Sequence, residues 1–174
     1  MRRILNNTGG WKTLICFIAA AFVASSGAAL EPARGDVVLR VSGAISKTNA
    51  EDIAALDIEM LEEMGAVTFE TSTIWTEGVQ RFTGVELSVL LDALDAAGTQ
   101  LRASAVNDYA VDIPMIDAKA GGPIVAFLRN GEEMNLRNKG PLWIVYPYDR
   151  APEYQSELIY SRSIWQLDRI EVLP

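Results

Sequence analysis

The feature that most constrains the fold of this chain is a change in the spacing of its apolar residues after Gly98. In residues 82–98, FTGVELSVLLDALDAAG, the leucines lie three or four positions apart, as in an amphipathic helix. Thr83 and Glu86 have the spacing of a capping box, so the helix is expected to begin at Thr83 and to end at Gly98. From residue 101 onward apolar and polar residues alternate, as in half-buried strands. The sequence therefore predicts an α+β fold with more sheet than helix.

Turn residues divide the rest of the chain into further elements. The pair Asn130-Gly131, between two strand-like runs, is typical of a type I′ hairpin turn. A second helix over residues 55–65 is predicted to be capped by Asp57. Strands are predicted over residues 36–43, 66–73, 101–106, 109–114, 123–128, 132–136, 141–147 and 163–173. In the helix expected between Thr83 and Gly98, the predicted core residues are Leu87, Leu90, Leu91 and Leu94. In the last strand they are Ile164, Leu167, Ile170 and Val172.

Residues 1–29 have the layout of a secretory signal peptide. A basic start precedes an unbroken run of eleven apolar residues, Leu14–Ala24, and small residues follow it. Eleven residues span about 16 Å as a helix, which is short of the ~30 Å hydrocarbon core of a bilayer. An uncleaved membrane anchor is the alternative. We expect a periplasmic or secreted protein that is not inserted in a membrane after cleavage, with one domain over residues 36–174.

Composition excludes several kinds of site. The chain has no histidine, and its one cysteine, Cys16, lies inside the apolar run of the signal peptide. The exported domain therefore has no disulfide, no thiolate or imidazole zinc site and no Ser-His-Asp triad. Of the 15 basic residues three precede residue 30, which leaves 12 against 23 acidic residues and a net charge of −11. Because nucleic-acid binding needs a basic surface, no nucleic acid is expected as a partner.

A first candidate binding group is Asn107, Asp108 and Tyr109, which combine amide, carboxylate and phenol between two predicted strands. Asn and Asp also favour turns for the sake of their own backbone, so the alternative is a turn followed by a strand aromatic.

A second candidate group is basic. Arg137 and Lys139 follow the predicted hairpin and are candidates for binding a small anion, whereas solvated charges at strand ends are the alternative. The last part of the chain is also rich in side chains with an apolar body and a polar tip, which suit a binding cleft or the edge of a core. These are Tyr146, Tyr148, Arg150, Tyr154, Tyr160 and Arg162.

An initial strand and five short motifs occur in a recognisable order. The motifs are W-x-x-x-V-x-x-F-T-G-V-E-L-x-x-L-L, N-D-Y-x-V-x-I-P, N-G-x-x-M, K-G-P-L-W-I-V-Y-P and W-Q-L-x-x-I-x-V. This order, from Val37 to Val172, resembles the molybdopterin-binding domain of sulfite-oxidase-type oxidoreductases, especially short exported proteins built from that domain alone. The resemblance implies a mixed α+β fold with a pocket that, in the enzymes, holds molybdenum on a pterin dithiolene.

The chain departs from this family at the metal ligand. The resemblance implies a molybdenum-binding cysteine within residues 71–73, where this chain has Ser72 as the counterpart. Serine is a harder ligand than thiolate and is rarely deprotonated without the metal. The expected phosphate loop, residues 148–163, contains no glycine and no lysine. We expect Ser72 at the floor of a pocket, with Trp75 beside it and Tyr109 facing it.

Three functions follow from these expectations. The leading one is a non-enzymatic periplasmic module without a metal, whose former cofactor pocket binds a small anion or a protein partner. The second is a genuine molybdopterin-dependent oxidoreductase with Ser72, or no protein ligand, at the metal. The third is a structural interaction domain with a filled pocket. The cofactor is unknown, since the resemblance implies molybdopterin but the thiolate ligand is absent.

Overall fold

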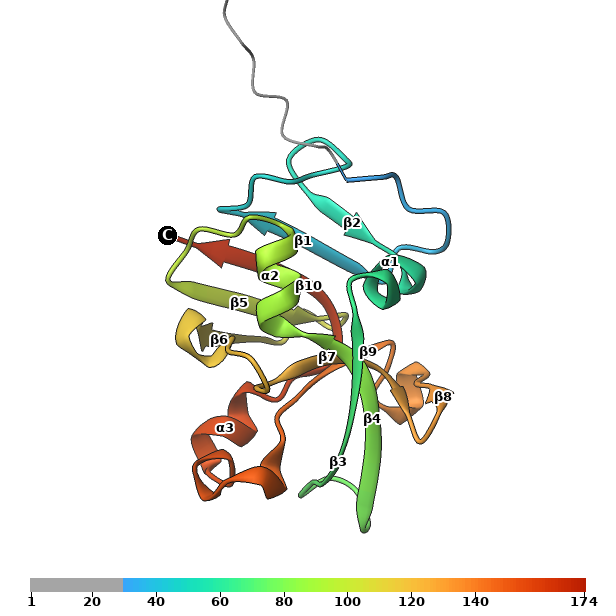
Figure 1. Cartoon of the computed structure of the whole chain (residues 1–174), viewed down its shortest axis with the longest axis vertical. Coiled ribbons are helices and arrows are strands. Elements are labelled where there is room, and N and C mark those ends of the chain that lie inside the picture. Colours follow the sequence, from blue (N-terminus) through green and yellow to red (C-terminus); the bar gives the residue numbers. More distant parts are fainter. Residues whose placement is uncertain (1–29) are drawn as a thin grey trace, which may run out of the picture.

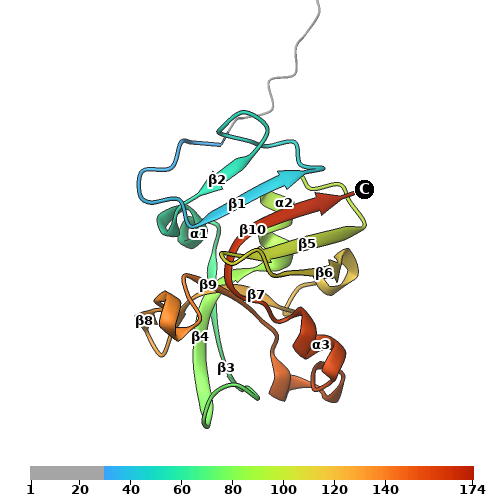
Figure 2. The same ribbon diagram turned by 180° about the vertical axis from the view of Figure 1, so that it is seen from behind.

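The computed structural model describes residues 30–174. The predicted signal peptide and Cys16 lie outside the described residues. Within residues 30–174 the chain forms a ten-stranded mixed sheet and three short α-helices (Figures 1 and 2). The predicted α+β class with more sheet than helix is confirmed. None of the helices in this part of the chain is long and apolar enough to cross a bilayer.

The sheet has the strand order β2-β1-β10-β9-β7-β4-β3. Strands β5 and β6 extend it from β10, and β8 pairs with β7. The strands are β1 (Leu39–Gly43), β2 (Ala54–Leu56), β3 (Ala66–Ser72), β4 (Val79–Glu86), β5 (Gln100–Ala105), β6 (Ala110–Pro114), β7 (Ile124–Arg129), β8 (Glu132–Glu133), β9 (Leu142–Val145) and β10 (Trp165–Leu173). The helices are α1 (Ile58–Glu63), α2 (Leu87–Ala93) and α3 (Glu157–Arg162).

The start of the main helix differs from the prediction. Thr83 lies inside β4, where its hydroxyl forms a hydrogen bond of 2.8 Å with that of Thr68, and α2 begins at Leu87. Glu86 occupies the cap position but makes no capping bond, and its carboxylate accepts the N–H of Gly121 instead. The capping-box interpretation is wrong because pairing of β4 with both β3 and β7 holds residues 79–86 extended. The helix also ends at Ala93, with Leu94 as its C-cap, short of Gly98.

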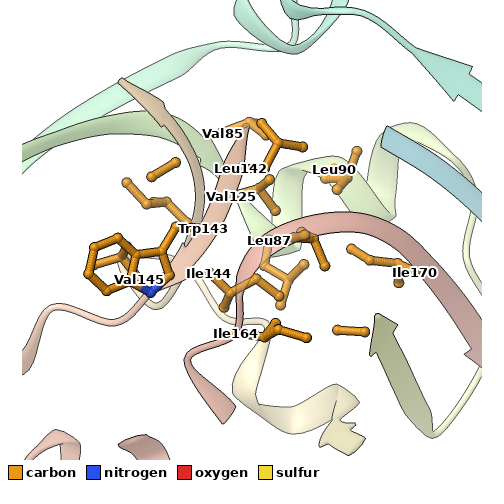
Figure 3. Packing of buried hydrophobic residues seen from close by; sticks show 14 of the residues in the cluster. Val85, Leu87, Leu90, Val125, Leu142, Trp143, Ile144, Val145, Ile164 and Ile170 are labelled. Carbon is orange, nitrogen blue, oxygen red and sulfur yellow. The ribbon is translucent and has the colours of Figure 1, made fainter. Parts of the chain in front are cut away.

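The predicted core is confirmed. Every leucine of the expected stripe on α2 is buried, and so are the four core candidates of the last strand segment. Figure 3 shows Leu87 and Leu90 of α2 facing the strands β7, β9 and β10, from which Val125, Leu142 and Ile170 project. All four residues of β9 are buried, as its continuous apolar run predicts.

Other predicted elements are confirmed with altered bounds. Asp57 caps α1, with its carboxylate accepting the N–H of Met60 at 2.9 Å. Asn130 and Gly131 have φ values of 56° and 86°, as a type I′ turn requires. The strand predicted over residues 132–136 is only two residues long, because Asn135 caps a 3₁₀ turn, Leu136–Asn138, with its side chain. Strands β2 and β4 and helix α3 were not predicted.

The fold brings distant segments together at one end. The β3–β4 hairpin and the α3 region both extend from the same end of the sheet (Figures 1 and 2). The 3₁₀ turn Tyr148–Arg150 lies against β3, where the hydroxyl of Thr71 accepts the N–H of Asp149. This end of the molecule contains the residues of the site described next.

Candidate ligand-binding site

Trp75 is the centre of an aromatic cluster. It lies in the β3–β4 loop and is half-buried. Its ring meets four other rings at centroid distances between 5.5 and 6.2 Å and interplanar angles between 65° and 84°. These edge-to-face contacts are the favourable geometry for aromatic pairs. The four partners come from β9, the segment after it, α3 and β10: Trp143, Tyr148, Tyr160 and Trp165.

A cavity of about 430 Å³ opens beside this cluster. Its volume lies in the range of small-molecule sites. The aromatic side chains around it come from three separate segments, the β3–β4 loop, the β5–β6 turn and the stretch from α3 into β10. The lining residues are Trp75, Ala105, Asn107, Tyr109, Tyr160, Ser161, Ser163, Ile164, Trp165 and Gln166. None of these residues carries a charge, so the cavity is an aromatic site with neutral polar groups.

Buried hydrogen bonds hold one wall of the cavity. The buried hydroxyl of Ser163 accepts the Tyr148 hydroxyl at 2.7 Å and donates to the carbonyl of Ile159 at 2.8 Å. The carbonyl of Ser163 accepts the indole N–H of Trp143 at 3.2 Å. Burial raises the pKa of Tyr148 well above its usual value, so the phenol stays protonated and keeps donating. The aromatic wall is therefore fixed in position by satisfied polar groups.

The NDY turn contributes both to the turn and to the cavity. Asn107 accepts the N–H of Tyr109 at 3.2 Å, and Asp108 has the left-handed φ of 65°. The carboxylate of Asp108 forms an ion pair with Arg169 at 2.7 Å, outside the cavity lining. Asn107 and the largely exposed Tyr109 line the cavity. The turn alternative is confirmed by this geometry, and a binding role for Asn107 and Tyr109 stays a prediction.

Ser72 lies elsewhere. Its hydroxyl donates to Asp149 at 2.6 Å, and its backbone N–H donates to the other oxygen of the same carboxylate. The hydrogen bonds from Ser72 lower the pKa of Asp149, so the carboxylate is ionised at neutral pH. Ser72 is not among the residues that line the cavity. The cavity therefore does not have the expected Ser72 at its floor, because this side chain is hydrogen-bonded to Asp149 instead.

Neither predicted basic residue lines the cavity. Arg137 is exposed on the 3₁₀ turn Leu136–Asn138. The Nζ of Lys139 lies 4.0 Å from the ring centroid of Trp165 and 5.4 Å from that of Trp143. Burial against these rings, with a smaller effect from Arg129, lowers the pKa of Lys139. The ammonium group thus contacts the outer aromatic shell of the site without entering the cavity.

Sequence reasoning missed Trp165 and Gln166 as site residues and named Tyr160 only within a broad group. Tyr160 lies in α3, which was not predicted, and Trp165 and Gln166 begin β10. A signal was present in the short interval between Tyr160 and Trp165, which places two large rings around a polar Ser161-Arg162-Ser163 stretch. The interval gives no indication of which side of the sheet the rings face.

The residues present do not fit molybdopterin, the cofactor that the resemblance implies. The counterpart of the thiolate ligand is the hydroxyl of Ser72, which is hydrogen-bonded to the ionised carboxylate of Asp149. The negative charge of this carboxylate would repel the anionic groups of the cofactor, and the hydroxyl is a harder ligand than a thiolate. The cavity lining offers no lysine or arginine for a phosphate. In residues 30–174 no group of three or more acidic, cysteine or histidine residues is arranged to hold a metal ion.

Comparisons with known proteins give a likeness in structure. No protein-family model matches the chain. A search of curated proteins finds no match either. Among solved structures, the chain is similar to the sulfane dehydrogenase SoxCD from Paracoccus pantotrophus, with a TM-score of 0.57 and 18% sequence identity. The likeness covers 83% of this chain and 40% of that one, so the chain spans less than half of the enzyme chain that it matches. The chain therefore has a fold similar to part of a sulfane dehydrogenase.

Proposed function

We propose that this chain is an exported ligand-binding module that has a sulfite-oxidase-type fold and carries out no molybdenum catalysis. The observation that carries this proposal is the cavity of about 430 Å³, which is lined by uncharged side chains only, most of them aromatic or polar. Apolar pockets with a few convergent polar groups are the usual form of a small-molecule site. A domain with a filled pocket would have no need of such an opening.

The Ser72–Asp149 pair supports the loss of metal chemistry. A serine that takes the place of a thiolate at an oxidised metal binds most strongly as the deprotonated alkoxide. Here the hydroxyl of Ser72 keeps its proton and donates a hydrogen bond of 2.6 Å to the ionised carboxylate of Asp149. A second negative charge at Ser72 would face the carboxylate directly, which disfavours the alkoxide. Catalysis by a molybdopterin enzyme with Ser72 as ligand is the alternative function, and the fold likeness to a sulfane dehydrogenase is what favours it.

The bound molecule is expected to be small and uncharged or positively charged. A small anion or a periplasmic protein was expected from the sequence. The anion has less support, because Arg137 and Lys139 do not reach the cavity and the domain has a net charge of −11. A protein partner would need a larger surface than this cavity offers.

Native mass spectrometry and elemental analysis of protein purified from its own cells test the proposal. We expect far less than one molybdenum atom per chain, and a co-purified small molecule that is lost in Tyr160→Leu. Leu158→Ala, on the exposed face of the same helix, is the matched control and should retain the molecule. Molybdenum at one atom per chain would overturn the proposal in favour of the oxidoreductase. Wild-type protein without any bound molecule, and without uptake from a cell extract, would also contradict it.

A further inference from the structure

We propose that the cavity is an aromatic cage for a methylated ammonium group, of the kind found in choline and betaine-like molecules. This inference rests on the proposed function, since it names the ligand class of the same site. Three observations support it: the angles between the aromatic rings, the absence of charged residues in the lining, and the position of the Lys139 ammonium over the Trp165 ring.

The rings of the site form a corner. Trp75 meets Tyr160 at an interplanar angle of 84° and Trp165 at 68°. A flat heteroaromatic ligand is best held in a slot between parallel faces, which these angles do not provide. A compact, roughly spherical group such as trimethylammonium can touch several non-parallel walls at once. Tyr109, on the β5–β6 turn, adds a further aromatic side chain to the lining.

The electrostatics of the site favour a cation that sheds water easily. Aromatic faces attract cations through the ring quadrupole, and the attraction is strongest where water is excluded. The lining contains no lysine or arginine to repel a cation and no carboxylate to pair with a primary amine. A quaternary ammonium such as the trimethylammonium of choline has no N–H donors that need partners, so a neutral cavity leaves none unsatisfied. The net charge of −11 on the domain attracts cations to the surface.

Lys139 shows that this aromatic cluster already attracts an ammonium group. Its Nζ lies 4.0 Å from the centroid of Trp165, a ring that also lines the cavity. Lys139 itself does not line the cavity. A bound cation would therefore share the Trp165 ring with a like charge outside the cavity. Removing the charge at residue 139 should strengthen the binding of a cation and weaken the binding of an anion.

Two amides at the site have groups to offer the rest of a ligand. Gln166 donates its N–H to the carbonyl of Leu136, and its side-chain oxygen remains an acceptor. Asn107 uses its side-chain oxygen to accept the N–H of Tyr109, and its NH₂ group remains a donor. An acceptor and a donor at the cavity suit the hydroxyl of choline, which can accept and donate.

Isothermal titration of the purified protein tests the cage with choline and with 3,3-dimethylbutan-1-ol, in which an uncharged carbon replaces the nitrogen. We expect choline to bind at least about tenfold more tightly than the neutral alcohol. Lys139→Gln should tighten choline binding about two- to fivefold, and Tyr160→Leu should weaken it at least about tenfold. Leu158→Ala, outside the cavity, should leave the affinity unchanged. Circular dichroism of each variant verifies that it is folded.

Three outcomes would overturn the cage. The first is equal binding of choline and the neutral alcohol, which would make the site merely apolar. The second is weaker choline binding in Lys139→Gln, which would show that the charge of the lysine does not oppose a cation bound at Trp165. The third is no binding of choline or tetramethylammonium by a protein that holds another molecule in native mass spectra. In that last case the ligand-binding function stands and only the ligand class is wrong.

Discussion

The carboxylate of Asp149 accepts hydrogen bonds from both the hydroxyl and the backbone N–H of Ser72, 77 residues earlier in the chain. The backbone N–H of Asp149 in turn donates to the hydroxyl of Thr71. Together these bonds tie the end of edge strand β3 to the segment that follows β9. The link makes the position of the expected metal ligand a structural joint between two distant segments.

The joint should make stability depend on pH. The pKa of Asp149 is lowered in the folded state, so its contribution is present above the unfolded value of about 4 and is lost as pH falls below it. Asp149→Asn should cost about 1 kcal/mol at pH 7, since the group is exposed and water screens the interaction. Urea denaturation at pH 7 and pH 3 measures the difference. The loss should shrink at pH 3, and the exposed Asp36→Asn should show no comparable loss at pH 7. An equal loss for Asp149→Asn at both pH values would contradict this account.

A double-mutant cycle separates the two hydrogen bonds from Ser72. Ser72→Ala removes the hydroxyl but leaves the backbone N–H donating to Asp149. We expect a cost of about 0.5–1.5 kcal/mol for Ser72→Ala alone and a coupling of similar size with Asp149→Asn. Chemical denaturation of the four proteins gives the coupling energy. Additive losses would mean that the hydroxyl and the carboxylate do not act together.

The helix α2 should dominate the stability of the domain. Leu90 is completely buried against strands of the central sheet, as Figure 3 shows. Leu90→Ala should cost about 2–5 kcal/mol through lost transfer energy and the cavity left behind. Asp92→Ala, exposed on the same helix, is the control and should stay within about 0.5 kcal/mol. Urea midpoints decide the prediction, and a loss below about 1 kcal/mol for Leu90→Ala would contradict it.

The apolar pattern predicted much of this fold because it reports burial directly. The leucine stripe of α2 and the run of β9 each bury the side chains that their spacing selects. The start of α2 was mispredicted because Thr83 and Glu86 fit a local helix signal while tertiary pairing of β4 competes for the same residues. Gly84 was the missed clue, since an added Cβ would lie 2.2 Å from the carbonyl oxygen of Val125. Such a close approach of backbones indicates strand packing.

The site was less predictable than the fold. Trp75, Asn107 and Tyr109 were identified and line the cavity, but their common location depends on how the sheet curves. Lys139 and Arg137 were chosen for their charge, and charge alone gives no direction for a side chain. Trp165 begins a strand, and the alternation of apolar residues in that strand predicts which of them are buried. The position of Trp165 beside the cavity comes instead from its packing against Trp75. Contacts between segments distant in the sequence leave no local pattern.

Trp75 should be both a structural and a binding residue, and two kinds of substitution separate the roles. Trp75→Ala removes the ring that four other aromatic residues contact, so it should cost about 2–4 kcal/mol, less than a fully buried tryptophan because the side chain is half-buried. Trp75→Phe keeps an aromatic ring in contact with Tyr160 and Trp165 and should cost about half as much. Ile74→Ala, at the exposed neighbouring position, is the matched control and should change stability by less than about 0.5 kcal/mol. Urea denaturation followed by near-ultraviolet circular dichroism measures both the stability and the packing of the aromatic cluster. If Trp75→Ala were as mild as Ile74→Ala, the ring would not support the fold, and the proposed cavity wall would have to be held by Ser163 and its hydrogen bonds alone.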